Sequence, residues 1–353
     1  MIVVDCEKMR WTNCGIYTFC DELSAALLRQ QSQHQYKLGF YLRKKCRNVL
    51  GDVPRIFKRE LHKVVFYDPR IQLWHSTFQL KAIIPLGVPV VQTIHDLNYL
   101  YEDIDPYIKV KIHRNIARYI RRASHIVTIS EYVMNDLCAH FDLGDKPRSV
   151  IYNGYDTYNG PVEKPAYVPT HPYLFFIGGM LWKKNIHVLP CLLSGNNYEL
   201  VIAGSQDKPE HTKCIDAIMK EAAEWGVQDR VHIVGPVSEA VKYWYFRHCE
   251  AFVFPSLAEG FGLPAIEAMQ QGKPVFLSDH TSLPEIGDEY GYYFNHDFDR
   301  QGMIAEFKES MEHYHRHPDL PEQIKKHAMK FSWDEAARRY WDIYESLLNK
   351  HKK

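Results

Sequence analysis

The stretch AFVFPSLAEGFGLPAIEAM, Ala251 to Met269, combines an apolar run, a glycine turn and a helical pattern. The run AFVFPS is typical of a strand buried on both faces, as in a parallel sheet. Pro264 suits the first position of a helix, where its missing N–H costs nothing, and Gly272 would end that helix after about Gln271. The stretch therefore predicts a strand, a turn at the carboxyl end of that strand, and a helix.

Two glutamates flank the glycine turn, with Glu259 expected in the loop and Glu267 in the first turn of the helix. Helical side chains lean toward the N-terminus, so both carboxylates should reach one crevice. Gly260 and Gly262 let the backbone approach a ligand closely, and the free N–H groups at a helix start attract anions. Carboxylates accept hydrogen bonds from sugar hydroxyls, so the arrangement suits a ligand with hydroxyls at both ends and phosphates between them. The alternative is an acidic helix start that favours the dipole.

Short apolar runs alternate with helical patterns throughout the 353 residues, which predicts βαβ units and parallel sheets. The expected strands span residues 2–5, 64–67, 90–94, 125–129, 173–177, 199–203, 231–234, 251–254 and 274–277. The expected helices include residues 17–30, 107–122, 131–140 and 214–225. The proline-rich segment 157–172 predicts a linker. We therefore expect two doubly wound α/β domains, residues 1–157 and 170–334, with a ligand in the cleft between their sheets.

The overall composition excludes several classes of protein. The 43 basic residues balance the 43 acidic residues, which argues against a general nucleic-acid partner. The eight cysteines form no C-x-x-C pair and no Cys/His spacing of a zinc site, which indicates reduced thiols. No signal peptide is visible, and no apolar run approaches the roughly 20 residues of a membrane span. We expect a cytoplasmic protein that meets a membrane only peripherally, at its inner face.

The spacing of Glu259 and Glu267, with Gly-Phe-Gly-Leu-Pro between them, resembles the E-x7-E signature of glycosyltransferase family 4. This resemblance implies a GT-B fold of two Rossmann-like domains facing across a cleft. It also implies retaining transfer from a nucleotide-sugar, with the donor in the C-terminal domain and the acceptor in the N-terminal domain. In the family, the residue that matches Glu259 binds the donor sugar. The residues that match Gly260, Phe261, Gly262 and Leu263 contact the sugar and the diphosphate. The residue that matches Glu267 binds the ribose.

Other segments extend the resemblance along nearly the whole chain. NCGIYTF at residues 13–19 resembles a glycine loop, in which Gly15 would approach the diphosphate or the acceptor. TIHDL at residues 93–97 would place His95 near the donor sugar. FFIGGMLWKKN at residues 175–185 resembles the phosphate segment, where Gly178 and Lys184 would contact the diphosphate and Lys184 would stabilise the leaving group. Gly179 stands where the family has an arginine, which leaves one fewer cation for the leaving group.

Two further segments complete the resemblance. VHIVGPVSE at residues 231–239 would surround the nucleotide base, with main-chain contacts from Pro236 and Val237. The closing FSWDEAARRYWDIYESLL resembles a terminal helix that returns to the first domain, at about residues 335–353. No D-x-D motif lies in the right context, because DIDP at residues 103–106 is in the first half. We expect metal-independent activity without a cofactor, the nucleotide-sugar being a co-substrate.

A basic helix face is predicted in the first half of the chain. Four cations spaced by three, four and four residues share one face, Lys111, Arg114, Arg118 and Arg122. The opposite, buried face is marked by Ile108, Ile112, Ile116 and Ile120. A second basic cluster comprises Arg43, Lys44, Lys45, Arg47, Arg55, Lys58 and Arg59. These residues form either a solvated surface or a surface for an anionic lipid or a diphosphate-linked acceptor.

The sequence favours a glycosyltransferase that moves a sugar from a UDP- or GDP-linked donor to a glycan or lipid-linked acceptor. By resemblance, the setting is bacterial surface-polysaccharide assembly. The expected catalytic residues are Glu259, Lys184 and His95. A phosphorylase or epimerase of the same fold is an alternative, and so is a catalytically silent nucleotide-sugar-binding subunit, which Gly179 motivates. A nicotinamide-dependent dehydrogenase is disfavoured, because no G-x-G-x-x-G follows a strand.

Overall fold

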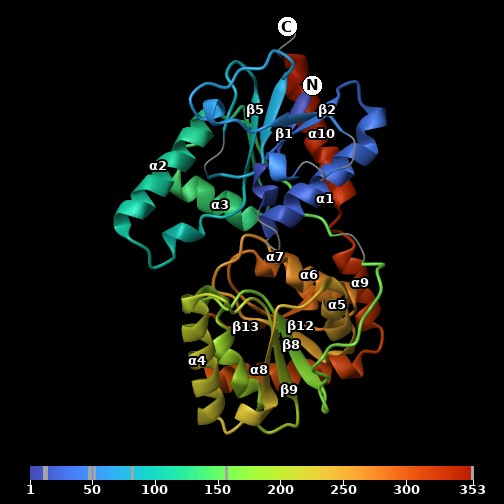
Figure 1. Cartoon of the computed structure of the whole chain (residues 1–353). Helices are drawn as coiled ribbons and strands as arrows, with labels where there is room; N and C mark the ends of the chain where they lie inside the picture. The colour runs from blue at the N-terminus through green and yellow to red at the C-terminus, as the bar shows by residue number, and fades with distance from the viewer. Residues whose placement is uncertain (11–14, 47–49, 51–52, 81–82, 156–157, 351–353) are drawn as a thin grey trace. The chain divides into compact units, whose positions relative to one another are not determined.

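The computed structural model describes residues 1–10, 15–46, 50, 53–80, 83–155 and 158–350 (Figure 1). It divides into two compact units, of which the first comprises Met1–Gly154 with Phe331–Lys353 and the second comprises Tyr155–Lys330. The first boundary lies close to the predicted end of the N-terminal domain at residue 157. The return to the first unit at Phe331 precedes the predicted residue 335, and the terminal helix itself begins at Trp333.

The first unit is built on a seven-stranded sheet in the order β3-β2-β1-β4-β5-β6-β7, in which every pair of neighbours is parallel. Its strands are β1 Ile2–Asp5, β2 Leu38–Leu42, β3 Arg55–Phe57, β4 Leu73–Ser76, β5 Val90–Ile94, β6 His125–Thr128 and β7 Arg148–Val150. The strand order reverses direction between β1 and β4, and the carboxyl ends of the strands at such a reversal are where open α/β sheets usually bind ligands.

The second unit repeats the design with a six-stranded parallel sheet in the order β10-β9-β8-β11-β12-β13. Its strands are β8 Tyr173–Ile177, β9 Glu199–Ala203, β10 Val231–Gly235, β11 Ala251–Phe254, β12 Val275–Ser278 and β13 Gly291–Phe294. The apolar runs of β8 and β11 lie side by side at the centre, where Phe176 stacks on Phe254 with ring centroids 5.7 Å apart. The order reverses between β8 and β11, so the general rule for such sheets predicts a ligand site after these two strands.

Helices connect the strands, and each predicted helix overlaps an observed one. The α-helices are α1 Gly15–Gln30, α2 Pro106–Arg122, α3 Glu131–His140, α4 Pro209–Glu224, α5 Glu239–His248, α6 Leu263–Gln270, α7 Leu283–Gly287, α8 Arg300–Arg316, α9 Leu320–Ala328 and α10 Trp333–Lys350. The 3₁₀ helices are η1 Glu7–Arg10, η2 Gln31–Gln33, η3 Lys44–Cys46, η4 Glu60–Lys63, η5 Asn98–Leu100, η6 Trp182–Lys184, η7 Ile186–Leu193, η8 Gln228–Arg230 and η9 Asp288–Tyr290.

The strand predicted at residues 64–67 is wrong. Val64 is 81% exposed and Tyr67 is 69% exposed, and the chain forms η4 and a turn there. The strand of this region is β4, with the sequence LWHS, whose four residues are all buried. Its polar residues concealed it from an apolar pattern, yet His75 is satisfied inside the protein because Nε2 lies 2.8 Å from Thr93 Oγ1.

The C-terminal helix α10 belongs to the first unit and packs against α1 (Figure 1). Buried tyrosines tie it to the sheet, because the hydroxyl of Tyr344 lies 2.7 Å from His75 Nδ1 and that of Tyr340 lies 2.9 Å from Thr93 Oγ1. Trp341 is fully buried, and its indole N–H donates to the Leu27 carbonyl of α1. These contacts fix the last helix to the first unit.

The segment before β8 is fastened by one buried carboxylate, Glu199, at the start of β9. Its oxygens accept hydrogen bonds from the Tyr167 hydroxyl, from the backbone N–H groups of Thr170 and His171, and from the Thr170 hydroxyl. Burial opposes ionisation, but these donors lower the pKa of Glu199 to about 2. The charged carboxylate therefore holds residues 167–171 on the edge of the second sheet.

None of the helices in the described part of the chain is both long enough and apolar enough to cross a bilayer.

Candidate active site

The loop before α7 holds the glycine turn that follows β11 in place through hydrogen bonds. The Ser282 hydroxyl donates to the carbonyl of Phe261 at 2.7 Å and to that of Glu259 at 3.2 Å, and the Glu259 N–H donates to Thr281 Oγ1 at 3.3 Å. Gly262 has φ +121°, and an added Cβ would lie 2.7 Å from a Leu283 methyl group. The turn therefore depends on glycine at this position.

This geometry shifts the predicted helix by one residue. Gly262 is the N-cap, so α6 begins at Leu263 and Pro264 is its second residue. Glu267 consequently opens the second turn and is not in the first turn, as the sequence predicted. The end of the helix agrees better, because Gly272 follows Gln271 with φ +71°.

Lys184 and Glu259 meet directly in the second unit. The Lys184 ammonium, at the end of η6, donates to Glu259 Oε1, and both side chains are largely buried. The same ammonium lies 4.9 Å from the centre of the Phe254 ring of β11. The Leu257 N–H also donates to the Lys183 carbonyl at 2.8 Å, so η6 and the glycine turn are joined by backbone as well. The structure thus brings the predicted phosphate lysine and the predicted sugar-binding carboxylate together.

Glu267 has a partner that the sequence analysis missed, Lys242 of α5. The ammonium of Lys242 lies 2.8 Å from Glu267 Oε1 and 2.8 Å from Glu239 Oε2. Burial raises the pKa of Glu267. Burial alone would lower the pKa of Lys242, but the two carboxylates raise it, so this lysine keeps its charge. The only sequence signal for it is the S-x-x-x-K spacing, because Ser238 caps α5 and places Lys242 one turn into the helix.

The loops after β8, β9 and β10 approach one another through glycines. The Gly178 N–H donates to the Ala203 carbonyl at 3.0 Å, and the Gly204 N–H donates to the Gly235 carbonyl at 2.9 Å. Gly204 has φ +150°, and a Cβ there would lie 1.7 Å from the Gly178 oxygen. This contact positions Gly178 at the start of the phosphate segment. By contrast, a Cβ at Gly179 would meet only Leu181 at 3.7 Å, so the fold itself does not exclude a side chain there.

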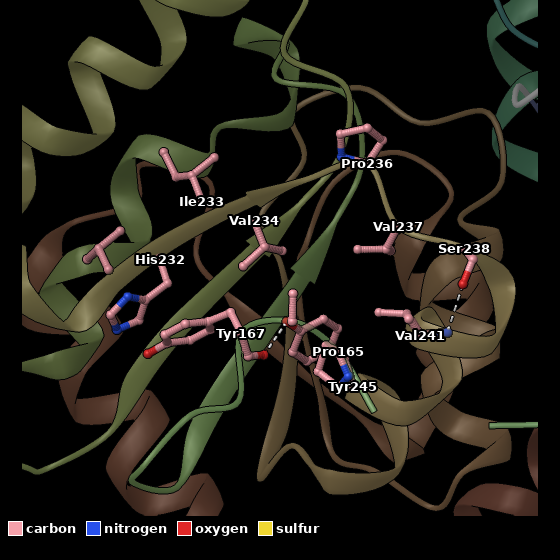
Figure 2. Close-up of a pocket in the computed structure, with 12 residues that line it drawn as sticks. Pro165, Tyr167, His232, Ile233, Val234, Pro236, Val237, Ser238, Val241 and Tyr245 are labelled. Carbon is pink, nitrogen blue, oxygen red and sulfur yellow. Dashed lines mark hydrogen bonds between the residues drawn. The ribbon is translucent and has the colours of Figure 1, made fainter. Parts of the chain in front are cut away.

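Val237, predicted to lie near the nucleotide base, lines a cavity in the second unit (Figure 2). This cavity of about 580 Å³ runs along β10 and α5 and is closed by residues 165–167, with the Tyr245 hydroxyl donating to the Tyr167 carbonyl at 2.7 Å. Pro236 lies at the end of the same hollow, away from Tyr167. Neither Glu259 nor Glu267 is among its lining residues, so Val237 and the carboxylates do not share this cavity.

Two of the residues predicted to lie near the donor, His95 and Gly15, belong to the first unit. His95 Nε2 lies 2.7 Å from the Thr77 carbonyl, so Nε2 must carry the hydrogen and Nδ1 has its lone pair. The ring lies edge-on to Phe19, and burial lowers the pKa of His95 to about 4, so it is neutral at pH 7. Gly15 is the first residue of α1, and among the described residues no atom lies within 4 Å of a Cβ added there.

Among the described residues, no group of three or more His, Cys, Asp or Glu side chains has the geometry to hold a metal ion.

Two family models match the chain. The model described as "Glycosyl transferases group 1" matches residues 163–331, and that described as "Glycosyltransferase Family 4" matches residues 17–158. The chain is 23% identical to the O-antigen chain mannosyltransferase RfbU of Salmonella typhimurium, over 71% of this chain and 68% of that protein. It is 32% identical to the serotype-specific mannosyltransferase WbdA of Escherichia coli, over 40% of this chain but only 17% of that protein.

Solved structures show the same fold. The sucrose-phosphate synthase of Thermosynechococcus elongatus matches with a TM-score of 0.74 and 16% identity, over 99% of both chains. Anabaena HepE, solved in complex with UDP-glucose, matches with a TM-score of 0.71 and 14% identity, over 98% of this chain and 99% of that one. The predicted pair of Rossmann-like α/β domains is therefore confirmed.

The contact between Gly204 and Gly178 predicts a strong effect of a single methyl group. Gly204→Ala should destabilise the protein by about 2–4 kcal/mol, because the methyl group would collide with backbone and alanine rarely adopts this φ. Gly195→Ala is the matched control, since Gly195 also has a positive φ but no atom within 4 Å of an added Cβ. Its cost should be about 1 kcal/mol. Urea denaturation measures both, and equal losses would contradict the close approach.

Proposed function

The chain belongs to glycosyltransferase family 4, whose models match both of its halves, and we propose that it transfers a sugar from a nucleotide-diphosphate donor to a glycan or lipid-linked acceptor. The observation that carries the proposal is the pair of lysine–glutamate contacts on either side of the glycine turn, Lys184 with Glu259 and Lys242 with Glu267. Each contact couples a carboxylate, which accepts from hydroxyls, to a cation, which attracts phosphate.

In this proposal the two carboxylates bind the two ends of the donor. Glu259 accepts hydrogen bonds from hydroxyls of the donor sugar, and Glu267 accepts them from the ribose. The diphosphate lies between them, against the N–H groups at the start of α6. Lys184 then turns from Glu259 toward the diphosphate and stabilises the charge that develops on the leaving group. Lys242 stays with Glu267, where it favours the ionised form of that carboxylate and orients it.

The chemistry proposed is retaining and independent of a metal ion. The acceptor hydroxyl attacks from the face that the diphosphate leaves, and a departing phosphate oxygen takes its proton. His95, neutral with its Nδ1 lone pair available, accepts a hydrogen bond from a hydroxyl of the donor sugar. Gly15 leaves room for the diphosphate or the acceptor beside the first turn of α1, which has no acidic residue.

The proposed donor is a UDP- or GDP-linked sugar, and mannose is the first sugar to test. Relatives named as mannosyltransferases support mannose, because one spans most of this chain and another exceeds 30% identity over part of it. A solved structure of the same fold holds UDP-glucose, which supports a nucleotide-sugar as the class of donor. The O-antigen role named for the Salmonella relative supports surface-polysaccharide assembly as the setting.

Donor binding tests the role of Glu267. A panel of UDP- and GDP-sugars should contain one that raises the melting temperature of the wild type. Glu267→Gln should weaken its binding about tenfold or more, because hydrogen bonds to a charged acceptor are lost. Calorimetry measures the affinity. The matched control is Glu224→Gln, at an exposed glutamate of α4, which should bind normally. If no nucleotide-sugar of the panel raised the melting temperature, the result would contradict the proposal.

Turnover measurements test whether the absence of an arginine at position 179 limits catalysis. Gly179→Arg should raise kcat about tenfold, because a second cation would then face the leaving group, while Gly179→Gln should not. Product formation with and without a metal chelator measures both variants, and we expect no loss on chelation. A wild type and a Gly179→Arg variant that bind donor but neither transfer nor hydrolyse it would identify a silent binding subunit instead.

We also propose that α2 contacts an anionic membrane surface. Lys111, Arg114, Arg118 and Arg122 are all exposed, although Arg122 also donates to the Pro85 carbonyl. The opposite face departs from the prediction in one respect: Ile116 and Ile120 are buried and Ile112 is partly buried, but Ile108 is 47% exposed. The first five residues of the helix also expose Tyr107 and Val110. Apolar side chains beside cations suit the interface of an anionic bilayer.

Flotation with liposomes tests this contact. Wild-type protein should float with anionic liposomes at low salt and not with neutral ones, because each cation contributes about 1 kcal/mol. The combined change Lys111→Gln, Arg114→Gln and Arg118→Gln should abolish flotation. The control removes the same charge from exposed lysines of the second unit, by Lys208→Gln, Lys213→Gln and Lys220→Gln. Equal loss in both variants would show that only net charge matters and would refute an α2 contact.

A further inference from the structure

One residue of the loop after β12 has a backbone conformation that its side chain disfavours. Thr281 has φ +61°, in the left-handed region, and its Cβ is branched. Five non-glycine residues in the described part of the chain have a positive φ, the other four being Leu50, Asn185, Asp288 and Phe298. None of those four has a branched Cβ, and a branched residue is a true outlier in this region. The fold therefore keeps a strained threonine at this position.

The hydroxyl group of Thr281 is hydrogen-bonded on two sides. It donates to the His280 carbonyl at 2.7 Å, and it accepts from the Glu259 N–H at 3.3 Å. A hydroxyl has one hydrogen to donate, so the bond to the carbonyl leaves its lone pairs for the N–H of Glu259. The bond to His280 therefore fixes the direction from which Thr281 accepts.

Two serines of the same loop hold the backbone on the other side of Glu259 and before it. The Ser282 hydroxyl donates to the Glu259 carbonyl at 3.2 Å, and the Ser278 hydroxyl donates to the Ser256 carbonyl at 2.6 Å. Both serines are fully buried. Thr281 and Ser282 thus hold the N–H and the C=O of the same residue, which is the one that carries the predicted sugar-binding carboxylate.

A second left-handed residue lies beside the ion-pair partner of Glu259. Asn185 has φ +54° and is 4% exposed, and it directly follows Lys184, whose ammonium donates to Glu259 Oε1. Asparagine tolerates this conformation better than threonine does. A left-handed non-glycine residue therefore adjoins each partner of the pair, one through a peptide bond and the other through a hydrogen bond. Residues of this kind gather at ligand-binding sites, where the surrounding structure holds them in place.

We propose that Thr281 is a positioning residue for Glu259. Its hydroxyl fixes the Glu259 N–H and so the direction in which the carboxylate leaves the glycine turn. This matters most when Lys184 turns toward the diphosphate, because the carboxylate then loses its ion-pair partner and only the backbone keeps it in place. Glycine would fit the conformation without strain but has no hydroxyl. The inference rests on the proposed transferase function, in which Glu259 binds the donor sugar.

Three substitutions separate the hydroxyl from the strain. Thr281→Val removes the hydroxyl and keeps the branched Cβ, Thr281→Gly removes both, and Thr281→Ser keeps the hydroxyl. The first two should lower kcat/KM for the donor about tenfold, because a displaced binding group is costly, and the third should keep most of it. Acceptor-independent hydrolysis measures this, with GDP-mannose or whichever UDP- or GDP-sugar binds the wild type. Thr281→Gly should melt no lower than the wild type, because glycine adopts this φ freely.

Hydrogen exchange tests the positioning without any substrate. Exchange of the peptide that covers residues 256–262, followed by mass spectrometry, should be about fivefold faster in Thr281→Val and Thr281→Gly, because the Glu259 N–H loses its acceptor. Thr281→Ser should exchange like the wild type. The matched control is Asp288→Gly, at an exposed residue of the second unit with φ +48°. It should change neither the hydrolysis of the donor nor the exchange of this peptide.

Three results would overturn the proposal. The first is a loss of donor hydrolysis in Thr281→Ser equal to that in Thr281→Val. The second is unchanged exchange of residues 256–262 in both variants that lack the hydroxyl. The third is a fall of about 5 °C or more in the melting temperature of Thr281→Gly, which would show that the threonine serves the stability of the fold.

This proposal and the transferase proposal fail separately. Faster exchange in Thr281→Val, with no nucleotide-sugar bound or hydrolysed by the wild type, would support the positioning of the turn and refute the transferase. Donor hydrolysis by the wild type that is unchanged in Thr281→Val would support the transferase and refute the role of Thr281.

Discussion

A carboxylate that leaves water needs a cation or several hydrogen-bond donors beside it, and four glutamates of this protein illustrate that requirement. Glu199 is satisfied by the segment that precedes β8, and Glu7 by four cations. Glu259 and Glu267 each contact one lysine on either side of the glycine turn. The partners come from distant segments, so these charges add contacts between parts of the chain that lie far apart in the sequence.

The second constraint is the parallel sheet. Because the carboxyl ends of all strands meet at one edge, residues that follow different strands become neighbours without lying close in sequence. This places Lys184, after β8, against Glu259, after β11. It also places Arg43 and Lys58 around Glu7 in the other unit. The backbone must approach closely at such an edge, and Gly204 against the Gly178 oxygen shows how little room remains.

The family resemblance carried much of the assignment of function, and the structure adds to it in two places. Lys242 gives Glu267 a permanent cation, which a resemblance based on the E-x7-E spacing does not contain. Gly179 stands where the family has an arginine, and an added Cβ there would meet only Leu181, so steric crowding does not require glycine at this position.

The sequence by itself determined the two α/β units, the central apolar strands β1, β8 and β11, and the glycine turn between two glutamates. These features are local, since they depend on apolar runs, on glycine and on helix signals within about 20 residues. It named no strand at β2, β3, β4, β7 or β13. In β4 the polar His75 is hydrogen-bonded to Thr93 and Tyr344, which are distant in the sequence. Only the tertiary structure decided which lysine holds which glutamate, and it gathered four cations around Glu7. Charge pairing across a sheet edge depends on strand order, and strand order leaves no periodic signal in the sequence.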